Sequence, residues 1–217
     1  MTRKLFWTDP YLTHLQTSIT SVADRTLTVS ETIFYAFAGG QESDAGTIAG
    51  RRVVEARKDG SEIRYTLADA SGLHLGDPVN IEIDWARRYR LMRLHFAAEI
   101  ILELAYQNLG PITKIGAHIA PDKSRIDFEW PQNISESFPL LSEKAHALID
   151  ADLPIVSNFS DEAQERRIWE IVGFARVACG GTHLRRTGEV GPLDLRRKNI
   201  GKGKERIEIA FKSDPLP

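Results

Sequence analysis

Residues 85–107, WARRYRLMRLHFAAEIILELAYQ, decide the class of fold. Neither proline nor glycine interrupts them, and apolar side chains recur at steps of three and four residues. The recurring residues are Leu91, Leu94, Ala98, Ile101, Leu102 and Ala105. This spacing predicts a long helix with one buried face. Asn108, Gly110 and Pro111 are typical of the stop that follows such a helix.

The residues before this helix form short β-type runs separated by turn residues. The runs are residues 27–29, 32–35, 52–56, 63–67 and 79–83. Asp59-Gly60 separates two of them, and this dipeptide suits a tight hairpin because it tolerates positive φ. Short strands at hairpin spacing predict a small β-barrel or a compact sheet.

The residues after the helix mix both patterns. We expect strands at residues 112–119 and 125–130, joined by a turn at Pro121-Asp122. A helix at 138–150, a strand at 154–158 and a short helix opened by Ser160 or Asp161 should follow. Two strands, 193–197 and 206–211, come last. The fold class is therefore α+β, with a barrel-like domain at residues 1–84 packed on an α+β domain at 85–217.

Composition and charge limit the class of protein. The formal net charge is −2, so contact with nucleic acid requires a local basic patch, and a solvated surface is the simpler interpretation of the basic clusters. No apolar run approaches the roughly 20 residues of a membrane helix, which favours a cytoplasmic protein without a membrane partner. The single cysteine, Cys179, cannot form an internal disulfide.

Two residues of the predicted helix could share a metal ion. His95 and Glu99 stand four residues apart, which places them on one helix face with their Cβ atoms about 5–6 Å apart. Taken alone, a surface pair worth a few tenths of a kcal/mol is the simpler interpretation.

The motif CGGTH at residues 179–183 is a more specific signal. Cys179 and His183 can converge on one ion because the glycines between them let the backbone turn sharply, although a buried cysteine beside a glycine turn is the alternative. Zinc accepts mixed histidine, cysteine and carboxylate ligands, so His95, Glu99, Cys179 and His183 form a candidate zinc site. Such an ion would activate water or polarise an ester carbonyl.

Several motifs resemble, in order, those of the alanyl-tRNA synthetase editing family. They are Phe34-Tyr35, Gly39-Gly40-Gln41, Asp44 with Gly46, Asp84-Trp85, Arg87-Arg88, Met92-Arg93, His95, residues 179–183, Thr187-Gly188-Glu189, Lys202-Gly203-Lys204 and Arg206-Ile207. They span nearly the whole chain, and CGGTH in this order is highly specific compared with one short motif. Because the sequence leaves no room for an aminoacylation domain, it resembles the stand-alone editing proteins.

The resemblance implies a glycine-rich β-barrel followed by an editing domain shared in outline with threonyl-tRNA synthetases. It also implies a zinc-associated pocket that hydrolyses the aminoacyl ester at the 3′ end of mischarged alanine tRNA. Serine is the first expected amino acid and glycine the second. Gln41, Glu99 and Thr182 are the candidate catalytic residues. The candidate contacts to tRNA are Arg93, Lys202, Lys204 and Arg206.

Two positions depart from the family pattern. Glu99 stands where the family has a second histidine, and Phe96 where it usually has threonine. A carboxylate is an acceptable zinc ligand at about 2.0–2.2 Å, although its negative charge would make the bound metal a weaker Lewis acid. Alternatively, Glu99 acts as a base on water. Phe96 replaces a small hydroxyl with a bulky ring, so a donor to a serine substrate is lost or the pocket is narrowed.

Two other functions stay open because of these departures. One is a tRNA-binding protein of the same fold that has lost hydrolysis, which should bind with strong salt dependence and leave the ester intact. The other is a zinc hydrolase of a different aminoacyl-tRNA or of a small ester or amide. Residues 95–99, HFAAE, match neither the zincin pattern nor its inverted form, so a metalloprotease is not expected.

Overall fold

The fold is described by a computed structural model covering residues 2–212. The chain divides into two compact units. The first unit is the chain up to Ala38 together with Glu42–Tyr89, and the second is Gly39–Gln41 together with the chain from Arg90 onward. The long helix α1, Trp85–Asn108, therefore contributes its first five residues to the first unit and the rest to the second. A domain boundary at residue 84 stays a prediction.

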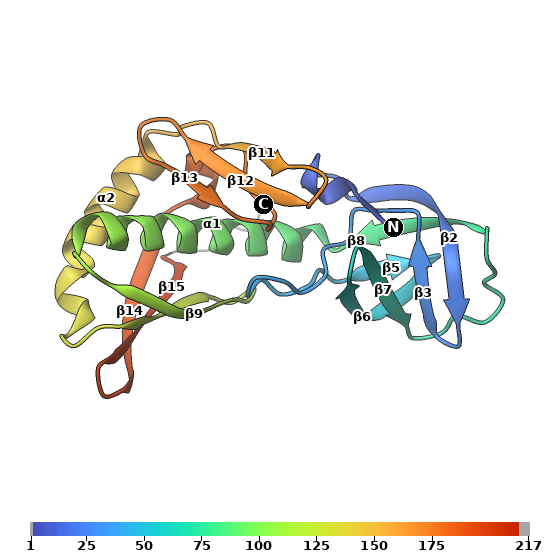
Figure 1. Cartoon of the computed structure of the whole chain (residues 1–217), viewed down its shortest axis with the longest axis horizontal. Coiled ribbons are helices and arrows are strands. Elements are labelled where there is room, and N and C mark those ends of the chain that lie inside the picture. Colours follow the sequence, from blue (N-terminus) through green and yellow to red (C-terminus); the bar gives the residue numbers. More distant parts are fainter. Residues whose placement is uncertain (1, 213–217) are drawn as a thin grey trace. The chain divides into compact units, whose positions relative to one another are not determined.

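The first unit is built from strands, and six of them close into a barrel in the order β2-β3-β7-β6-β5-β8 (Figure 1). The elements are β1 Arg3–Lys4, β2 His14–Ala23, β3 Thr26–Val29, β4 Glu31–Thr32, β5 Gly46–Ile48, β6 Arg51–Asp59, β7 Glu62–Leu67, β8 Pro78–Ile83 and a 3₁₀ turn at Leu5–Trp7. The core of this unit includes Leu27, Phe34, Ile48, Tyr65 and Ile81.

The hairpin expected around Asp59-Gly60 is present between β6 and β7. Asp59 pairs with Glu62, so the two turn residues are Gly60, with a φ of 58°, and Ser61. The strand expected at residues 32–35 ends at Thr32 instead. Backbone amides of the residues that follow donate to side chains there: Phe34 to the Thr32 hydroxyl at 3.0 Å and Tyr35 to the Asp44 carboxylate at 2.7 Å.

The second unit places α1 between two sheets (Figure 1). Its elements after α1 are β9 Thr113–Ile119, β10 Ser124–Glu129, α2 Phe138–Asp150, β11 Val156–Asp161, β12 Arg166–Ile171, β13 Ala175–Ala178, β14 Leu193–Gly201, β15 Lys204–Phe211 and 3₁₀ turns at Ile134–Ser137 and Thr187–Val190. One sheet has the order β14-β15-β10-β9 and the other β11-β12-β13. The mixed α+β class predicted from the sequence is confirmed.

Helix α1 is buried on more sides than predicted. Every residue from Leu91 to Leu102 is buried except Glu99, which is partly buried. The expectation of one buried face is wrong because the two sheets cover the helix from different sides. Leu94 belongs to a cluster with Ile119 of β9, whereas the ring of Phe96 meets that of Trp169 of β12 at 5.1 Å.

The short helix expected from Ser160 or Asp161 is also wrong. Residues 156–171 form the β11-β12 hairpin, and a bulge after Phe159 leads into its turn. Asp161 does cap one turn, because its carboxylate accepts the backbone amide of Gln164 at 3.1 Å. The turn ends at Glu165, where a φ of 54° reverses the chain into β12. Among the described residues, no helix combines the length and apolar character needed to cross a membrane.

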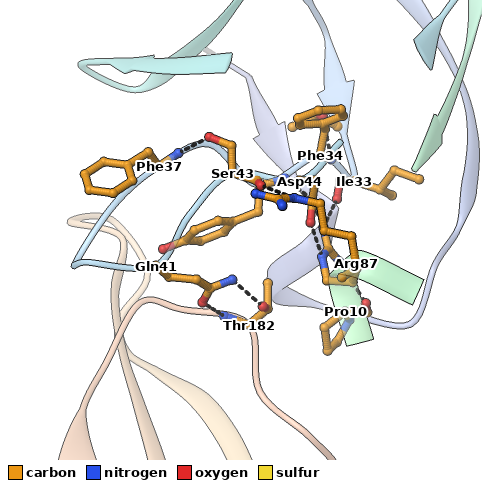
Figure 2. A network of polar contacts seen from close by, with 12 residues as sticks. Pro10, Ile33, Phe34, Phe37, Gln41, Ser43, Asp44, Arg87 and Thr182 are labelled. Carbon is orange, nitrogen blue, oxygen red and sulfur yellow. Dashed lines mark hydrogen bonds and ion pairs between the residues drawn. The ribbon is translucent and has the colours of Figure 1, made fainter. Parts of the chain in front are cut away.

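A fully buried ion pair joins α1 to the loop before β5. Arg88 donates to both carboxylate oxygens of Asp44 and to the carbonyls of Pro10 and Ile33. Figure 2 shows the contacts around Asp44. Neither side chain of the pair has exposed surface. Removing one partner of such a pair leaves an uncompensated charge in the interior, which is more costly than the pair itself is favourable.

Asp44→Asn should therefore lower the free energy of unfolding by about 3–5 kcal/mol. The matched control is Glu55→Gln, because Glu55 pairs with Arg57 on the surface, where both side chains are exposed. The control should change the free energy of unfolding by less than about 0.5 kcal/mol. Urea unfolding followed by aromatic circular dichroism measures both. Equal effects of the two substitutions would contradict the role given to the buried pair.

Candidate metal centre

Three residues predicted as metal ligands come together in the second unit. His95 lies on α1, Cys179 follows the last residue of β13, and His183 lies four residues further along. One donor atom from each residue lies within 4.8 Å of a donor atom from the other two. His95 and His183 are buried, and Cys179 is partly buried. The structure thus brings together three of the four predicted ligands.

The loop that carries Cys179 and His183 is held against β12 by its backbone. The Cys179 amide donates to the Arg167 carbonyl at 3.0 Å, and the Arg167 guanidinium donates to the Gly181 carbonyl at 3.3 Å. A Cβ atom at Gly181 would lie 1.9 Å from Cε1 of His95. Glycine is therefore required here by close approach to the imidazole, because any side chain would displace it.

The spacing of the donors suits a tetrahedral ion. The Sγ of Cys179 lies 3.4 Å from Nε2 of His95. Zinc bonds of 2.0–2.3 Å at tetrahedral angles separate two ligands by about 3.5 Å. His183 pairs its Nδ1 with the Ser157 hydroxyl at 2.9 Å, and its buried Nε2 has no hydrogen-bond partner among residues 2–212. These residues fit a zinc ion, because Nε2 of His183 is left for a ligand bond while Ser157 orients the ring.

Glu99 lies beside this cluster but is not one of its three members. Its Oε1 is 3.3 Å from Nε2 of His95, and its Oε2 accepts a hydrogen bond from the indole of Trp169 at 3.2 Å. Both carboxylate oxygens are therefore engaged, one at the cluster and one on β12. Trp169 thus fixes the carboxylate in position.

Burial and mutual contacts shift the pKa values of three groups at the cluster. Burial alone would lower the pKa of His95, but the charges of Cys179 and Glu99 raise it to about 10. Burial alone would raise the pKa of Glu99, but contacts with His95, His183 and Trp169 lower it to about 2. Burial, and then the positive charge of His95, lower the pKa of His183 well below its usual value. The cluster therefore contains a protonated His95 paired with the anionic carboxylate of Glu99, beside a neutral His183, so a metal ion that binds here has to displace the proton of His95.

Gln41 and Thr182, both predicted to be catalytic, are in direct contact (Figure 2). The amide nitrogen of Gln41 donates to the Thr182 hydroxyl at 2.9 Å, and the Thr182 backbone amide donates to Oε1 of Gln41 at 3.3 Å. The backbone of this loop is docked on β9, since the Ile119 amide donates to the Gly40 carbonyl at 2.8 Å. Gln41 therefore lies in a segment that is held both by β9 and by the 179–183 loop.

Phe96, the second departure from the family pattern, is fully buried. Its ring packs edge-on against Trp169 and lies 6.0 Å from the ring of His183. The ring thus fills space next to a candidate ligand where a threonine would offer a hydroxyl.

The four predicted tRNA contacts fall into two groups. Arg93 is buried, donates to the Val190 carbonyl at 3.0 and 3.2 Å, and lies 3.9 Å over the ring of Phe211. Arg206 donates to both oxygens of Asp127, at 2.6 and 3.0 Å. Both guanidinium groups are thus engaged by partners within the protein, and their contact with tRNA stays a prediction. By contrast, both predicted lysines are exposed at the β14-β15 hairpin. They are Lys202 and Lys204.

Sequence reasoning missed two residues that orient the cluster, Ser157 and Trp169. Trp169 lies in residues 166–171, RRIWEI, where buried and less buried positions alternate as in a half-covered strand. The residue types do not follow this alternation, because Arg167 is buried and Ile168 is less so, and the local sequence therefore gives no clear signal for Trp169. Nothing in the local sequence marks Ser157, because its contact with His183 depends on the pairing of β11 with β12.

Comparison with known proteins finds similarity along nearly the whole chain. Residues 167–208 match the family described as the threonyl and alanyl tRNA synthetase second additional domain. The alanyl-tRNA editing protein AlaX-M of Pyrococcus horikoshii is 30% identical, over 96% of this chain and 97% of its own length. AlaX-M of Methanosarcina mazei is 32% identical over 97% of both chains.

A synthetase shows similarity along the same residues. The alanine–tRNA ligase of Methanococcus maripaludis is 29% identical over 96% of this chain, which matches only 26% of the ligase. Similarity over nearly the whole length of both AlaX-M proteins, with the CGGTH loop inside the matched family domain, decides the assignment. The chain belongs to the family of alanyl-tRNA editing proteins.

Proposed function

We propose that this protein is a zinc-dependent aminoacyl-tRNA deacylase that acts in trans, in the cytoplasm, on mischarged alanine tRNA. The observation that carries the proposal is the convergence of His95, Cys179 and His183, with one donor atom of each within 4.8 Å of the others. Nitrogen and sulfur donors favour zinc over magnesium or calcium. When bound, zinc would supply Lewis acidity toward an ester carbonyl or a water molecule.

Glu99 would complete the donor set rather than act as the base on water. Its contact with Nε2 of His95 supports this assignment. Trp169 would hold the carboxylate in the orientation needed for a ligand.

Seryl-tRNA(Ala) is the proposed first substrate and glycyl-tRNA(Ala) the second. With Phe96 packed on Trp169, residue 96 supplies no hydroxyl for a serine side chain. Discrimination between serine and glycine should therefore be weaker than in a site that hydrogen-bonds the substrate hydroxyl, where loss of the bond leaves buried groups unpaired.

Deacylation of alanine tRNA charged with serine, glycine or alanine tests the proposal directly. The zinc-loaded protein should release serine and glycine much faster than alanine, and a chelated sample should release each at the uncatalysed rate. If all three esters decay at the uncatalysed rate while the loaded protein still binds the tRNA, the protein is a binding module that has lost hydrolysis. Rapid release without preference for alanine tRNA would indicate a hydrolase of another ester.

The hairpin lysines should contribute to tRNA affinity through the phosphate backbone. The double substitution of Lys202 and Lys204 by alanine should weaken binding and reduce the slope of log K against log salt by about 1 for each lost contact. Lys58→Ala is the matched control, because Lys58 is an exposed lysine near the tip of the β6-β7 hairpin. Filter binding between low and moderate salt measures the slopes. An unchanged slope in the double variant would assign the lysines to solvated surface.

A further inference from the structure

In the contact between Gln41 and Thr182, it is fixed which group donates each hydrogen bond and which accepts it. We call this direction the polarity of the contact. A backbone amide can only donate, so the group of Gln41 that faces the Thr182 amide must be the carbonyl oxygen Oε1. The opposite group, Nε2, then faces the Thr182 hydroxyl at 2.9 Å and must donate to it. The orientation of the Gln41 side chain is thus fixed by the hydrogen bonds themselves.

This polarity leaves the proton of the Thr182 hydroxyl without an acceptor. The hydroxyl oxygen accepts from Gln41, and among residues 2–212 no group accepts a hydrogen bond from it. Thr182 is only 1% exposed, so solvent offers little compensation. A buried donor without a partner normally costs free energy, and such groups are typical of positions that a ligand completes.

The position of Thr182 indicates which substrate atom its free O–H group would contact. Thr182 directly precedes His183 and lies three residues after Cys179, in the loop whose Gly181 abuts the His95 ring. A substrate group that reaches the three candidate ligands would therefore approach this loop. The atom that fits an unused O–H donor is an acceptor oxygen that gains negative charge as the reaction proceeds.

We propose that Thr182 is a catalytic hydrogen-bond donor to the carbonyl oxygen of the aminoacyl ester, and that Gln41 is the positioning residue that sets its polarity. This inference rests on the proposed deacylase function. As water adds to the carbonyl carbon, the carbonyl oxygen becomes an oxyanion and the hydrogen bond from Thr182 strengthens. When the ester bond breaks, the 3′-oxygen of the ribose takes up a proton and the amino acid leaves with the oxygen of water.

Binding of a stable substrate analogue tests the contact without turnover. The probe is 3′-seryl-amino-3′-deoxyadenosine with ¹³C at the carbonyl carbon, whose amide resists hydrolysis. Binding to the zinc-loaded protein should shift the ¹³C carbonyl resonance to the value expected for a carbonyl that accepts a hydrogen bond. Thr182→Val, which keeps the shape but removes the hydroxyl, should abolish that shift, and Thr182→Ser should restore it.

Kinetics with matched variants tests the polarity. Thr182→Val should lower kcat for seryl-tRNA about 10²–10³-fold, as removal of one oxyanion donor does elsewhere, with little change in KM. Gln41→Glu keeps an acceptor for the Thr182 amide but replaces the Nε2 donor with an acceptor, which draws the hydroxyl proton toward residue 41. It should lower kcat by a similar factor, and the double variant should lose no more than either single one. Zinc content should stay at one ion per chain throughout.

Each outcome supports or overturns a distinct statement. If the analogue does not bind the wild-type protein, the proposed function and this inference both fail. If it binds with a carbonyl shift that Thr182→Val leaves unchanged, the deacylase proposal stands and the role of Thr182 is wrong. If the losses from Gln41→Glu and Thr182→Val multiply in the double variant, Gln41 acts on the substrate directly and is not a positioning residue. If zinc is lost in parallel with activity, the contact between Gln41 and Thr182 only holds the loop in its structure and has no role in catalysis.

Discussion

Replacing Cys179 by alanine should remove zinc binding and deacylation together. Cys179 supplies the only sulfur donor of the cluster, and its Sγ lies 3.4 Å from Nε2 of His95. Without it, two imidazoles and the neighbouring Glu99 remain, which are too few donors for the proposed four-ligand zinc site. We expect zinc affinity to fall by more than the 10–100-fold that typically follows loss of an outer-shell partner. The rate of serine release should then equal that of the chelated wild-type protein.

Ser157→Ala provides the graded control for this result. Ser157 contacts Nδ1 of His183 at 2.9 Å but offers no ligand to the ion. Its loss should reduce zinc affinity about 10–100-fold and leave partial activity at saturating zinc. Competition with a chromogenic chelator measures both affinities. Wild-type zinc affinity in Cys179→Ala would show that the metal, if one is bound, lies elsewhere, and the proposed site would have to be abandoned.

The parts of the fold that were predictable from sequence are those with strong local patterns. Residues 85–107 lack helix breakers and have helical periodicity, and α1 spans Trp85–Asn108. The turn residues Pro121-Asp122 indicated the hairpin between β9 and β10, which is present. The two motifs with metal-ligand spacing are brought together because α1 and the 179–183 loop pack in the same unit.

The parts that escaped prediction depend on contacts distant in sequence. Residues 160–165, SDEAQE, have good helix-forming composition, yet residues 160–161 end β11 and residues 162–165 form the turn, because the strands on either side pair with each other. The position of Arg93 also depends on a contact distant in sequence. A basic residue beside His95 could be expected to face a phosphate, but it is buried and donates to Val190, 97 positions away.

The structure shows what surrounds Glu99 and Phe96, the two positions that depart from the family pattern. Sequence alone left Glu99 as either a ligand or a base, and the hydrogen bond from Trp169 gives a physical reason to prefer the ligand. Trp169 also packs on Phe96, so one β12 residue supports both unusual positions.

Replacing Gly181 in the 179–183 loop should also cause a large loss of zinc affinity. Gly181→Ala would place a Cβ atom 1.9 Å from Cε1 of His95, 2.5 Å from its Nδ1 and 2.9 Å from Oε1 of Gln41. None of these contacts can persist, and His95 has little room to move because α1 is buried on nearly all sides. The imidazole must turn away or the loop must retreat, and in either case the three donors separate. Zinc affinity should fall by at least about 10–100-fold, as for other disturbances of ligand orientation.

Gly180→Ala is the matched control one residue away. A Cβ atom at Gly180 would meet nothing within 4 Å, and its φ lies outside the left-handed region. The control should therefore bind zinc as the wild type does, although it adds the same methyl group to the same loop. Cobalt substitution provides the measurement, because the visible absorption of the bound ion reports its coordination geometry. Equal losses in the two variants would mean that the loop needs glycine for flexibility, whereas a loss confined to Gly181→Ala would establish that the backbone approaches His95 closely to hold it in the cluster.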